Sequence, residues 1–269
     1  MLLANHHAPL ASFFVSNFFL SPMGNRISMA STGAWVGSTI DDADIQRLRQ
    51  GRFLGKEDEV GARAPDPKEI LPNPEKGEVV VFNAHLERGL ALPVSSFFSD
   101  FLRFYGLQPH HLGANCLTQL SFFATLCEAY LGIWPSVEVW RMFFFLRAQT
   151  TEWRLRDCGC VSIYSKSSPF PKILLPDSIK KWQCSYFYVK NLTDVDRIGL
   201  PAFSDATSTE KSWNRKTSGD PELEVILTKR LKELVTSSLT CRDLTMAWLS
   251  RRMFPLQARS HKMCFYSGR

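Results

Sequence analysis

Two short clusters of histidine and cysteine are the first places where this sequence could bind a metal ion. His110 and His111 are adjacent, so they point about 100° apart on a helix and to opposite faces on a strand. Cys158 and Cys160 are separated by one residue, which is tighter than the usual spacing of zinc-binding pairs, and no second pair stands in register with them. We therefore expect no metal site and no cofactor, and we interpret the histidines as a pair at the end of a loop.

The motifs that would identify an enzyme are absent from the sequence. It contains no Gly-x-x-x-x-Gly-Lys loop, no Gly-x-Ser-x-Gly turn and no His-Glu-x-x-His pair. Acidic residues are abundant, but none ends a convincing strand core, where two-metal nucleases usually present their ligands. We expect no catalytic residue and no small-molecule substrate, and hence a protein that is not an enzyme.

Short clusters that mix cations with aromatic or polar residues are the candidate nucleic-acid contacts. Aromatic rings stack on bases while cations meet phosphates, so this mixture suits single-stranded nucleic acid. The candidate residues are Lys180, Lys181, Trp182, Arg215, Lys216, Arg251, Arg252, Arg259 and Lys262. A solvated helix end is the commoner explanation for Arg251 and Arg252, because cations are also favoured at helix C-termini.

The charge of the 269-residue chain is compatible with a polyanionic partner. Lysine and arginine number 32 and aspartate and glutamate 26, a net charge of +6. Residues 41–100 carry −4 (8 basic, 12 acidic), residues 101–219 carry +5 (14 and 9), and residues 220–269 carry +4 (9 and 5). An acidic front and a basic back could orient the protein on RNA or DNA, or pair copies of it head to tail. Scatter over a solvated surface is the simpler explanation.

Composition and cysteine usage indicate a globular protein inside the cell. The chain is 45% hydrophobic and 22% charged, which excludes a disordered or collagen-like protein. It has 7 cysteines, an odd number, and most have apolar neighbours, as in a reducing compartment. Residues 11–20 are too short and too polar to span a bilayer, and no basic segment precedes them as in a signal peptide. We expect a protein of the nucleus or cytoplasm that is neither secreted nor bound to a membrane.

The elements that position these residues are predicted to form an α+β fold, mostly helical, with a small antiparallel sheet and a C-terminal helix pair. Helices are expected at 41–50 with a Thr39–Asp42 capping box, after N-caps at Ser96 and Asn115, from Ser136 through Arg147, from Asp220, and from Thr240 to Pro255. Strands are expected at 78–82, 153–164 and 182–189, the last two pairing antiparallel across the link 169–176. Residues 55–77 are predicted to be a loop.

The same patterns predict the domain organisation. Residues 1–28 form an N-terminal extension and residues 29–203 the main globular α+β region. Residues 204–219 form a linker, rich in serine, threonine and lysine, around Trp213, and residues 220–269 a C-terminal helical segment. We expect this last segment to belong to the same family region as residues 29–203.

Several strings that run in order from about Met29 nearly to the last residue share one resemblance. They are Trp35-Val36-Gly37-Ser38-Thr39, Glu78-Val79-Val80-Val81-Phe82, His85-Leu86-Glu87-Arg88-Gly89, Phe104-Tyr105-Gly106-Leu107-Gln108-Pro109-His110-His111-Leu112, Gly132-Ile133-Trp134-Pro135, Lys180-Lys181-Trp182-Gln183 and Ser250-Arg251-Arg252. Together they resemble the plant proteins that carry the gypsy-type transposon domain, a retroelement-derived group abundant in grasses. Residues 1–28 have no counterpart in this resemblance.

The resemblance implies a retrotransposon-derived protein, gag-like or accessory, and brings no catalytic residues with it. The sequence has no Tyr-x-Asp-Asp of a reverse transcriptase, no Asp-Ser/Thr-Gly of a retroviral-type protease and no gag zinc knuckle. We therefore expect a non-catalytic structural or assembly protein that self-associates and contacts RNA or DNA. Two alternatives stay open: a DNA-binding or transposase-like enzyme, and a degenerate transposon reading frame with no selected function.

Overall fold

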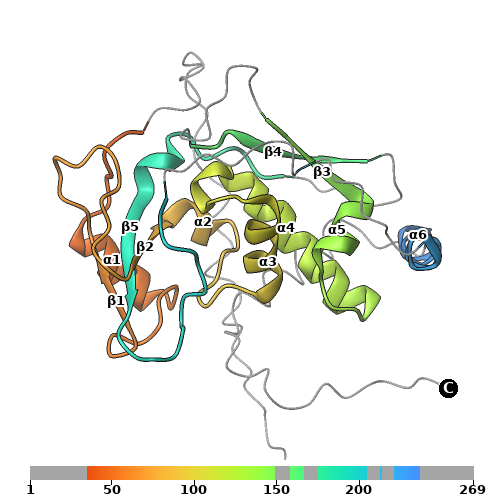
Figure 1. Cartoon of the computed structure of the whole chain (residues 1–269), viewed down its shortest axis with the longest axis horizontal. Helices are drawn as coiled ribbons and strands as arrows, with labels where there is room; N and C mark the ends of the chain where they lie inside the picture. The colour runs from red at the N-terminus through yellow and green to blue at the C-terminus, as the bar shows by residue number, and fades with distance from the viewer. Residues whose placement is uncertain (1–34, 149–157, 167–174, 205–212, 214–220, 237–269) are drawn as a thin grey trace, which may run out of the picture. The chain divides into compact units, whose positions relative to one another are not determined.

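β-Branched and aromatic residues form a three-stranded antiparallel sheet with strand order β1-β5-β2 (Figure 1). The strands are β1 Val60–Arg63, β2 Glu78–Phe82 and β5 Tyr186–Asn191, in a computed structural model that describes residues 35–148, 158–166, 175–204, 213 and 221–236. All residues of β2 and the first four of β5 are buried, so the sheet is covered on both faces. β-Branched and aromatic side chains favour such a pleated, buried surface.

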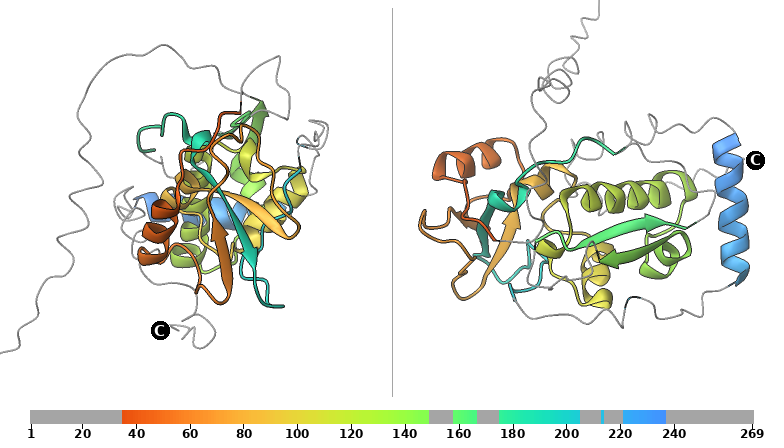
Figure 2. Two further views of the ribbon diagram at one scale, coloured as in Figure 1. Left: turned by 90° about the vertical axis from the view of Figure 1, so that its left-hand side faces the viewer. Right: turned by 90° about the horizontal axis from the view of Figure 1, so that it is seen from above.

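The helices supply most of the hydrophobic core. They are α1 Asp42–Gln50, α2 Asn83–Glu87, α3 Ser96–Tyr105, α4 Ala114–Leu126, α5 Val137–Phe143 and α6 Pro221–Thr236, with short turns η1 Pro109–His111, η2 Cys127–Leu131 and η3 Trp182–Ser185. The rings of Phe101 and Tyr105 on α3 lie 5.0 and 5.7 Å from that of Trp140 on α5, and all three are fully buried. These aromatic contacts fix the packing of α3 against α5 (Figure 2).

A second, two-stranded antiparallel sheet follows α5 directly. β3 Phe144–Ala148 pairs with β4 Val161–Ser165. Phe144 and Leu146 point into the core, and Val161 also forms a parallel bridge with Leu112. We call this pair of strands the β3–β4 ribbon.

Trp213 and α6 also pack on the helical core. The Trp213 side chain is 4% exposed, and its Nε1–H donates a hydrogen bond to the Tyr105 carbonyl oxygen at 3.2 Å. Leu227 and Leu231 of α6 are buried, and α6 contacts η2. The described residues all belong to one compact unit, 32–269. Among them, no helix is both long and apolar enough to cross a lipid bilayer.

The helix at 41–50 and the strand at 78–82 are confirmed, but three predicted N-caps are wrong. α1 is capped by Asp41, whose carboxylate accepts from Asp44 N at 2.8 Å, rather than by Thr39. Ser95 rather than Ser96 caps α3. α4 begins after Gly113, while the Asn115 side chain donates to the Pro176 carbonyl oxygen. In each case a residue one or two positions away could also cap the helix, through a side-chain oxygen or, for Gly113, through its backbone conformation. The spacing of the apolar residues did not distinguish the two candidates.

The predicted strand pairing is also wrong. β4 pairs with β3, and β5 pairs with β1 and β2, so residues 153–164 and 182–189 are not partners. The helix predicted through Arg147 ends at Phe143, Trp182 begins a 3₁₀ turn, and the predicted loop 55–77 contains β1. The pattern of a strand shows that it is half-buried but does not identify its partner.

The mixed α+β character is confirmed, whereas the expected predominance of helix is not. Of the predicted C-terminal helix pair, α6 corresponds to the first member. The second, predicted from Thr240 to Pro255, lies outside the described residues.

Candidate nucleic-acid interface

Three of the predicted contacts, Lys180, Lys181 and Trp182, lie within the described part of the chain, where η3 begins. Both lysine side chains are exposed. Lys181 has a φ of 54°, a left-handed conformation that is uncommon for residues other than glycine and that turns the chain into η3. The other predicted contacts are Arg215, Lys216, Arg251, Arg252, Arg259 and Lys262, and all of these lie outside the described residues.

The Trp182 indole is held against α2 by aromatic contacts. Its ring stacks on that of His85 at 5.0 Å and 26°, and it meets Phe82 edge-on at 5.2 Å. On another side, a Cβ added to Gly159 would lie 3.1 Å from Trp182 Cζ2. Trp182 is therefore a half-buried anchor of η3, and only part of its surface can meet a ligand.

The anchor is reinforced by hydrogen bonds between η3 and α2. Ser185 Oγ donates to the Trp182 carbonyl oxygen at 2.6 Å and accepts from Ala84 N at 3.1 Å. Arg88, just after α2, donates from Nη2 to the Asp177 carbonyl oxygen at 2.5 Å, which ties the approach to η3 to the same helix. Lys180 and Lys181 consequently project from a segment with a fixed backbone.

His85, which was not among the predicted contacts, is the buried partner of this arrangement. It is fully buried, and its Nε2 lies 3.0 Å from the Leu112 carbonyl oxygen. A carbonyl oxygen only accepts, so Nε2 carries the proton and donates. Burial lowers the pKa of His85 to about 3, although the hydrogen bond to Leu112 acts in the opposite direction. The imidazole is therefore neutral near pH 7 and holds α2 to the start of α4.

His110 and His111 lie in the 3₁₀ turn η1, between α3 and α4, and both are buried. Their rings lie 4.1 Å apart, and His111 Nδ1 accepts from Gln108 N at 2.9 Å. The His110 ring also contacts Trp35 at 5.1 Å. Within the described ranges, no three His, Cys, Asp or Glu side chains are grouped so that they could hold a metal ion.

Aromatic residues cover one face of the three-stranded sheet. This aromatic layer consists of Phe82, Tyr186 and Tyr188 together with the partly buried Trp35, Trp182 and Phe203. The shallow depression beside it is lined by Val80, Phe82, Gln108, Pro109, His110, Pro201 and Phe203 and encloses no space for a water molecule. The layer is filled by its own side chains, and the exposed Lys180 and Lys181 directly precede one of them, Trp182, in the chain.

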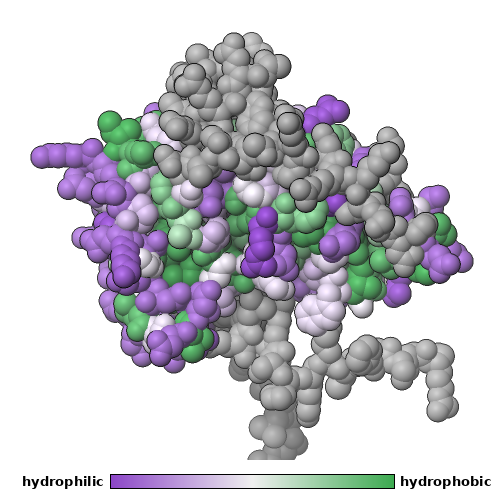
Figure 3. All heavy atoms as spheres, in the orientation of Figure 1, coloured by the Kyte–Doolittle hydropathy of each residue, from purple (hydrophilic) through white to green (hydrophobic). Residues whose placement is uncertain are grey.

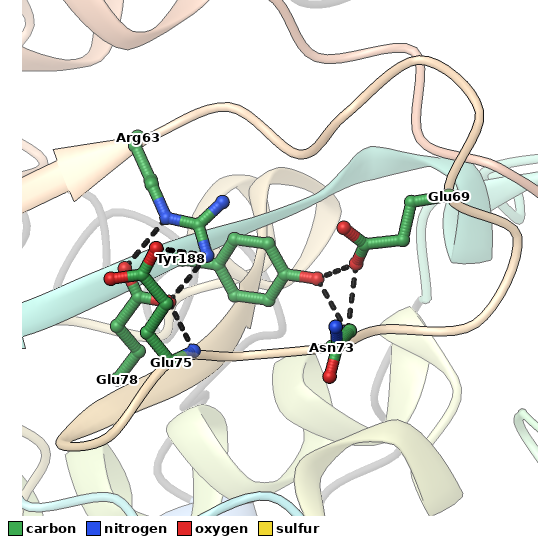
Figure 4. A network of polar contacts seen from close by, with 6 residues as sticks. All are labelled: Arg63, Glu69, Asn73, Glu75, Glu78 and Tyr188. Atoms are coloured by element: carbon green, nitrogen blue, oxygen red, sulfur yellow. Dashed lines mark hydrogen bonds and ion pairs between the residues drawn. The ribbon is translucent and has the colours of Figure 1, made fainter.

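Acidic side chains near the sheet serve structural contacts (Figure 4). Arg63 binds the Glu78 carboxylate with two hydrogen bonds, from Nε at 2.7 Å and from Nη2 at 2.6 Å, and its guanidinium lies 4.3 Å from the centre of the Tyr188 ring. Tyr188 in turn donates from its hydroxyl to the Glu69 carboxylate and accepts from Asn73 N. This network fastens the loop between β1 and β2 to the sheet.

The surface around α1 and β1 is largely hydrophilic. In Figure 3, hydrophilic residues gather over these elements and the loops beside them. Asp41, Asp42, Glu57 and Asp58 are exposed there, within the acidic front of residues 41–100. Part of the acidic front therefore meets solvent at the start of α1 and in the turn that precedes β1.

Residues 79–148, from β2 through β3, match the model of a family described as "Putative gypsy type transposon". That segment is similar to a transposon domain. It contains α2 to α5 and the three buried histidines, and Trp182 packs on it through His85. The match lies in the middle of the longer resemblance seen in the sequence. No curated protein and no solved structure matches the chain.

Proposed function

We propose that this protein is a non-catalytic structural or assembly protein of retrotransposon origin, gag-like or accessory, that contacts nucleic acid. The observation that carries the proposal is the structural use of the histidines in the segment that matches the transposon family. His85 donates to the Leu112 carbonyl oxygen and His111 accepts from Gln108 N, both within the core. A general acid or base must instead reach a substrate.

The buried thiols of the same segment support a scaffold role. Burial raises the pKa of Cys116 to about 11 and that of Cys127 to about 12, where the nearby Glu128 adds to the effect. The thiolate is the nucleophilic form of cysteine, so near neutral pH both residues behave as small core hydrophobes. Buried free thiols are also what a reducing intracellular compartment preserves.

Lys180 and Lys181 support the contact with nucleic acid. They are exposed cations on a backbone that Trp182 anchors to the core, so a phosphate can reach them from solvent. The sequence gives the region beyond residue 100 a positive charge, opposite to that of residues 41–100. This asymmetry also suits head-to-tail association of copies along a polyanion.

Light scattering of the full chain at low salt, with and without single-stranded RNA, tests the proposal. We expect the chain to bind RNA. The measured mass of the complex should exceed the mass of one protein bound to one RNA strand. A chain that stays monomeric and ignores RNA would contradict the proposal.

A nicking and strand-transfer assay with magnesium or manganese tests the non-catalytic part. We expect no product above background. Product that disappears on substitution of one aspartate or glutamate would overturn this part and favour a transposase-like enzyme.

A further inference from the structure

The β3–β4 ribbon presents two different faces. Phe144 and Leu146 on β3 and Ile163 on β4 point into the core, whereas the alternate residues point away from it. Phe145 lies directly opposite Tyr164, and Arg147 lies opposite Ser162. Because side chains alternate along a strand, all four of these residues share the outer face.

The outer face carries an aromatic pair with a cation upon it. The rings of Phe145 and Tyr164 are stacked at 5.7 Å and 27°, and 44% of Tyr164 is exposed. The Arg147 guanidinium carbon lies 5.0 Å from the centre of the Phe145 ring and 5.4 Å from that of Tyr164. These three side chains, with the guanidinium lying over the two rings, form a cluster of π-systems that we call the ribbon platform.

The charge of the platform is positive. Arg147 is exposed and has no ion pair with any side chain in the described part of the chain. Lys166 follows β4 directly, is exposed, and donates from Nζ to the Arg141 carbonyl oxygen at 2.5 Å, which places a second cation beside the ribbon. Neither strand contains an acidic residue.

We propose that the ribbon platform is a binding site for single-stranded nucleic acid, on which bases stack while Arg147 and Lys166 meet phosphates. Unpaired bases stack on aromatic rings and on guanidinium planes, and adjacent strands are a common support for such rings. The inference rests on the proposed contact with nucleic acid and gives it a second surface, separate from Lys180 and Lys181. A protein partner would leave the exposed cations without counter-charges unless it were acidic, whereas a nucleic acid supplies planar bases and anions together.

Fluorescence anisotropy with the full chain and a fluorescein-labelled oligouridine of about 12 nucleotides tests the site. We expect Tyr164→Ala and Arg147→Ala each to weaken binding about 5- to 150-fold, the range found when a base loses its stacking partner. Tyr164→Phe keeps the ring and should bind as the wild type does. Trp134→Ala is the matched control, because Trp134 is 77% exposed and lies outside the ribbon. Thermal unfolding followed by circular dichroism checks that each variant is folded.

Three results would overturn the inference, each in a different way. If the wild-type chain binds no oligonucleotide, the proposed contact with nucleic acid fails and the platform fails with it. If the wild type binds and both alanine variants bind equally well, the platform alone fails and the proposed function stands. If the variants leave binding intact but change the mass measured by light scattering, the platform is an interface between proteins.

Discussion

Arg63 reaches across the middle strand of the sheet and forms a bidentate ion pair with Glu78 on the far strand. Arg63 is on β1, Glu78 is on β2, and the ring of Tyr188 on β5 lies beneath the guanidinium. The Glu78 side chain is only 7% exposed. Burial by itself would raise the pKa of Glu78, but the hydrogen bonds from Arg63 and from Glu75 N hold it below its usual value. The pair therefore connects all three strands.

Breaking this pair should destabilise the fold measurably. Arg63→Ala leaves a buried carboxylate without its cation, and we expect it to lower the free energy of unfolding by about 2–3 kcal/mol. Arg103→Ala is the control, because its ion pair with Asp100 is exposed and should be worth less than about 0.5 kcal/mol. Urea unfolding followed by circular dichroism measures both, and equal losses would contradict the structural role of Arg63.

The Arg63–Glu78 pair should also contribute to the pH dependence of stability. The pKa of Glu78 is lowered in the fold from its ordinary 4.5, so the folded state holds the charged form more strongly than the unfolded state does. Its contribution is complete above the unfolded pKa and is lost as the pH falls through the folded pKa. Glu78→Gln should therefore flatten the loss of stability below about pH 4.5. Unfolding curves at pH 5 and pH 3 measure the difference.

His85 should make the protein less stable at a higher pH than Glu78 does, because the unfolded chain protonates this histidine first. The unfolded chain binds a proton at His85 near pH 6.5, whereas the folded chain resists it to about pH 3. The free energy of unfolding therefore falls as the pH drops below 6.5. Between pH 7.5 and pH 5.5, His85 accounts for about 1.4 kcal/mol of this fall. His85→Gln removes the titrating group and should reduce the loss over this interval by that amount. An equal loss in the variant and the wild type would mean that His85 is protonated within the fold.

Helices and strands could be predicted from the sequence where the pattern that marks them lies within the element itself or directly beside it. Residues 79–82 are a continuous apolar run after a turn rich in proline and glycine, and α1 has a cap followed by helical spacing. The change from α5 to β3 was missed because Phe143, Phe144 and Phe145 are equally apolar, so they fit a helical and an alternating pattern alike. Without polar residues between them, a run of apolar residues does not show whether the helical repeat of about 3.6 residues or the strand repeat of two applies.

The candidate functional surfaces were predictable only in part, for the same reason. Lys180, Lys181 and Trp182 are adjacent in the sequence, so a local mixture of cations and an aromatic residue identified them. Phe145 and Tyr164 meet only because β3 pairs with β4, and that pairing was not predicted. Partner choice depends on long-range packing, which a single sequence does not display.

Trp213 should contribute to the stability of the core although it was predicted to lie in a linker. It is 4% exposed and donates to the Tyr105 carbonyl oxygen. Trp213→Ala should cost about 3–5 kcal/mol, the usual range for removing a buried aromatic side chain. Trp213→Phe keeps most of the packing and loses the hydrogen bond, so about 1–2 kcal/mol is expected. Urea unfolding measures both, and a loss below about 1 kcal/mol for the alanine variant would show that Trp213 is not part of the core.

Lys180 and Lys181 should account for a defined part of the salt dependence of RNA binding. Each phosphate that a cation neutralises on a single strand contributes about −0.7 to the slope of log K against log salt concentration. Lys180→Gln/Lys181→Gln should therefore make the slope less steep by about 1.4 and leave the unfolding curve unchanged, because both side chains are exposed. Lys229→Gln/Arg230→Gln on α6 removes the same charge from exposed positions and controls for net charge. If both double variants change the slope equally, RNA responds to the total charge of the protein rather than to a contact at η3.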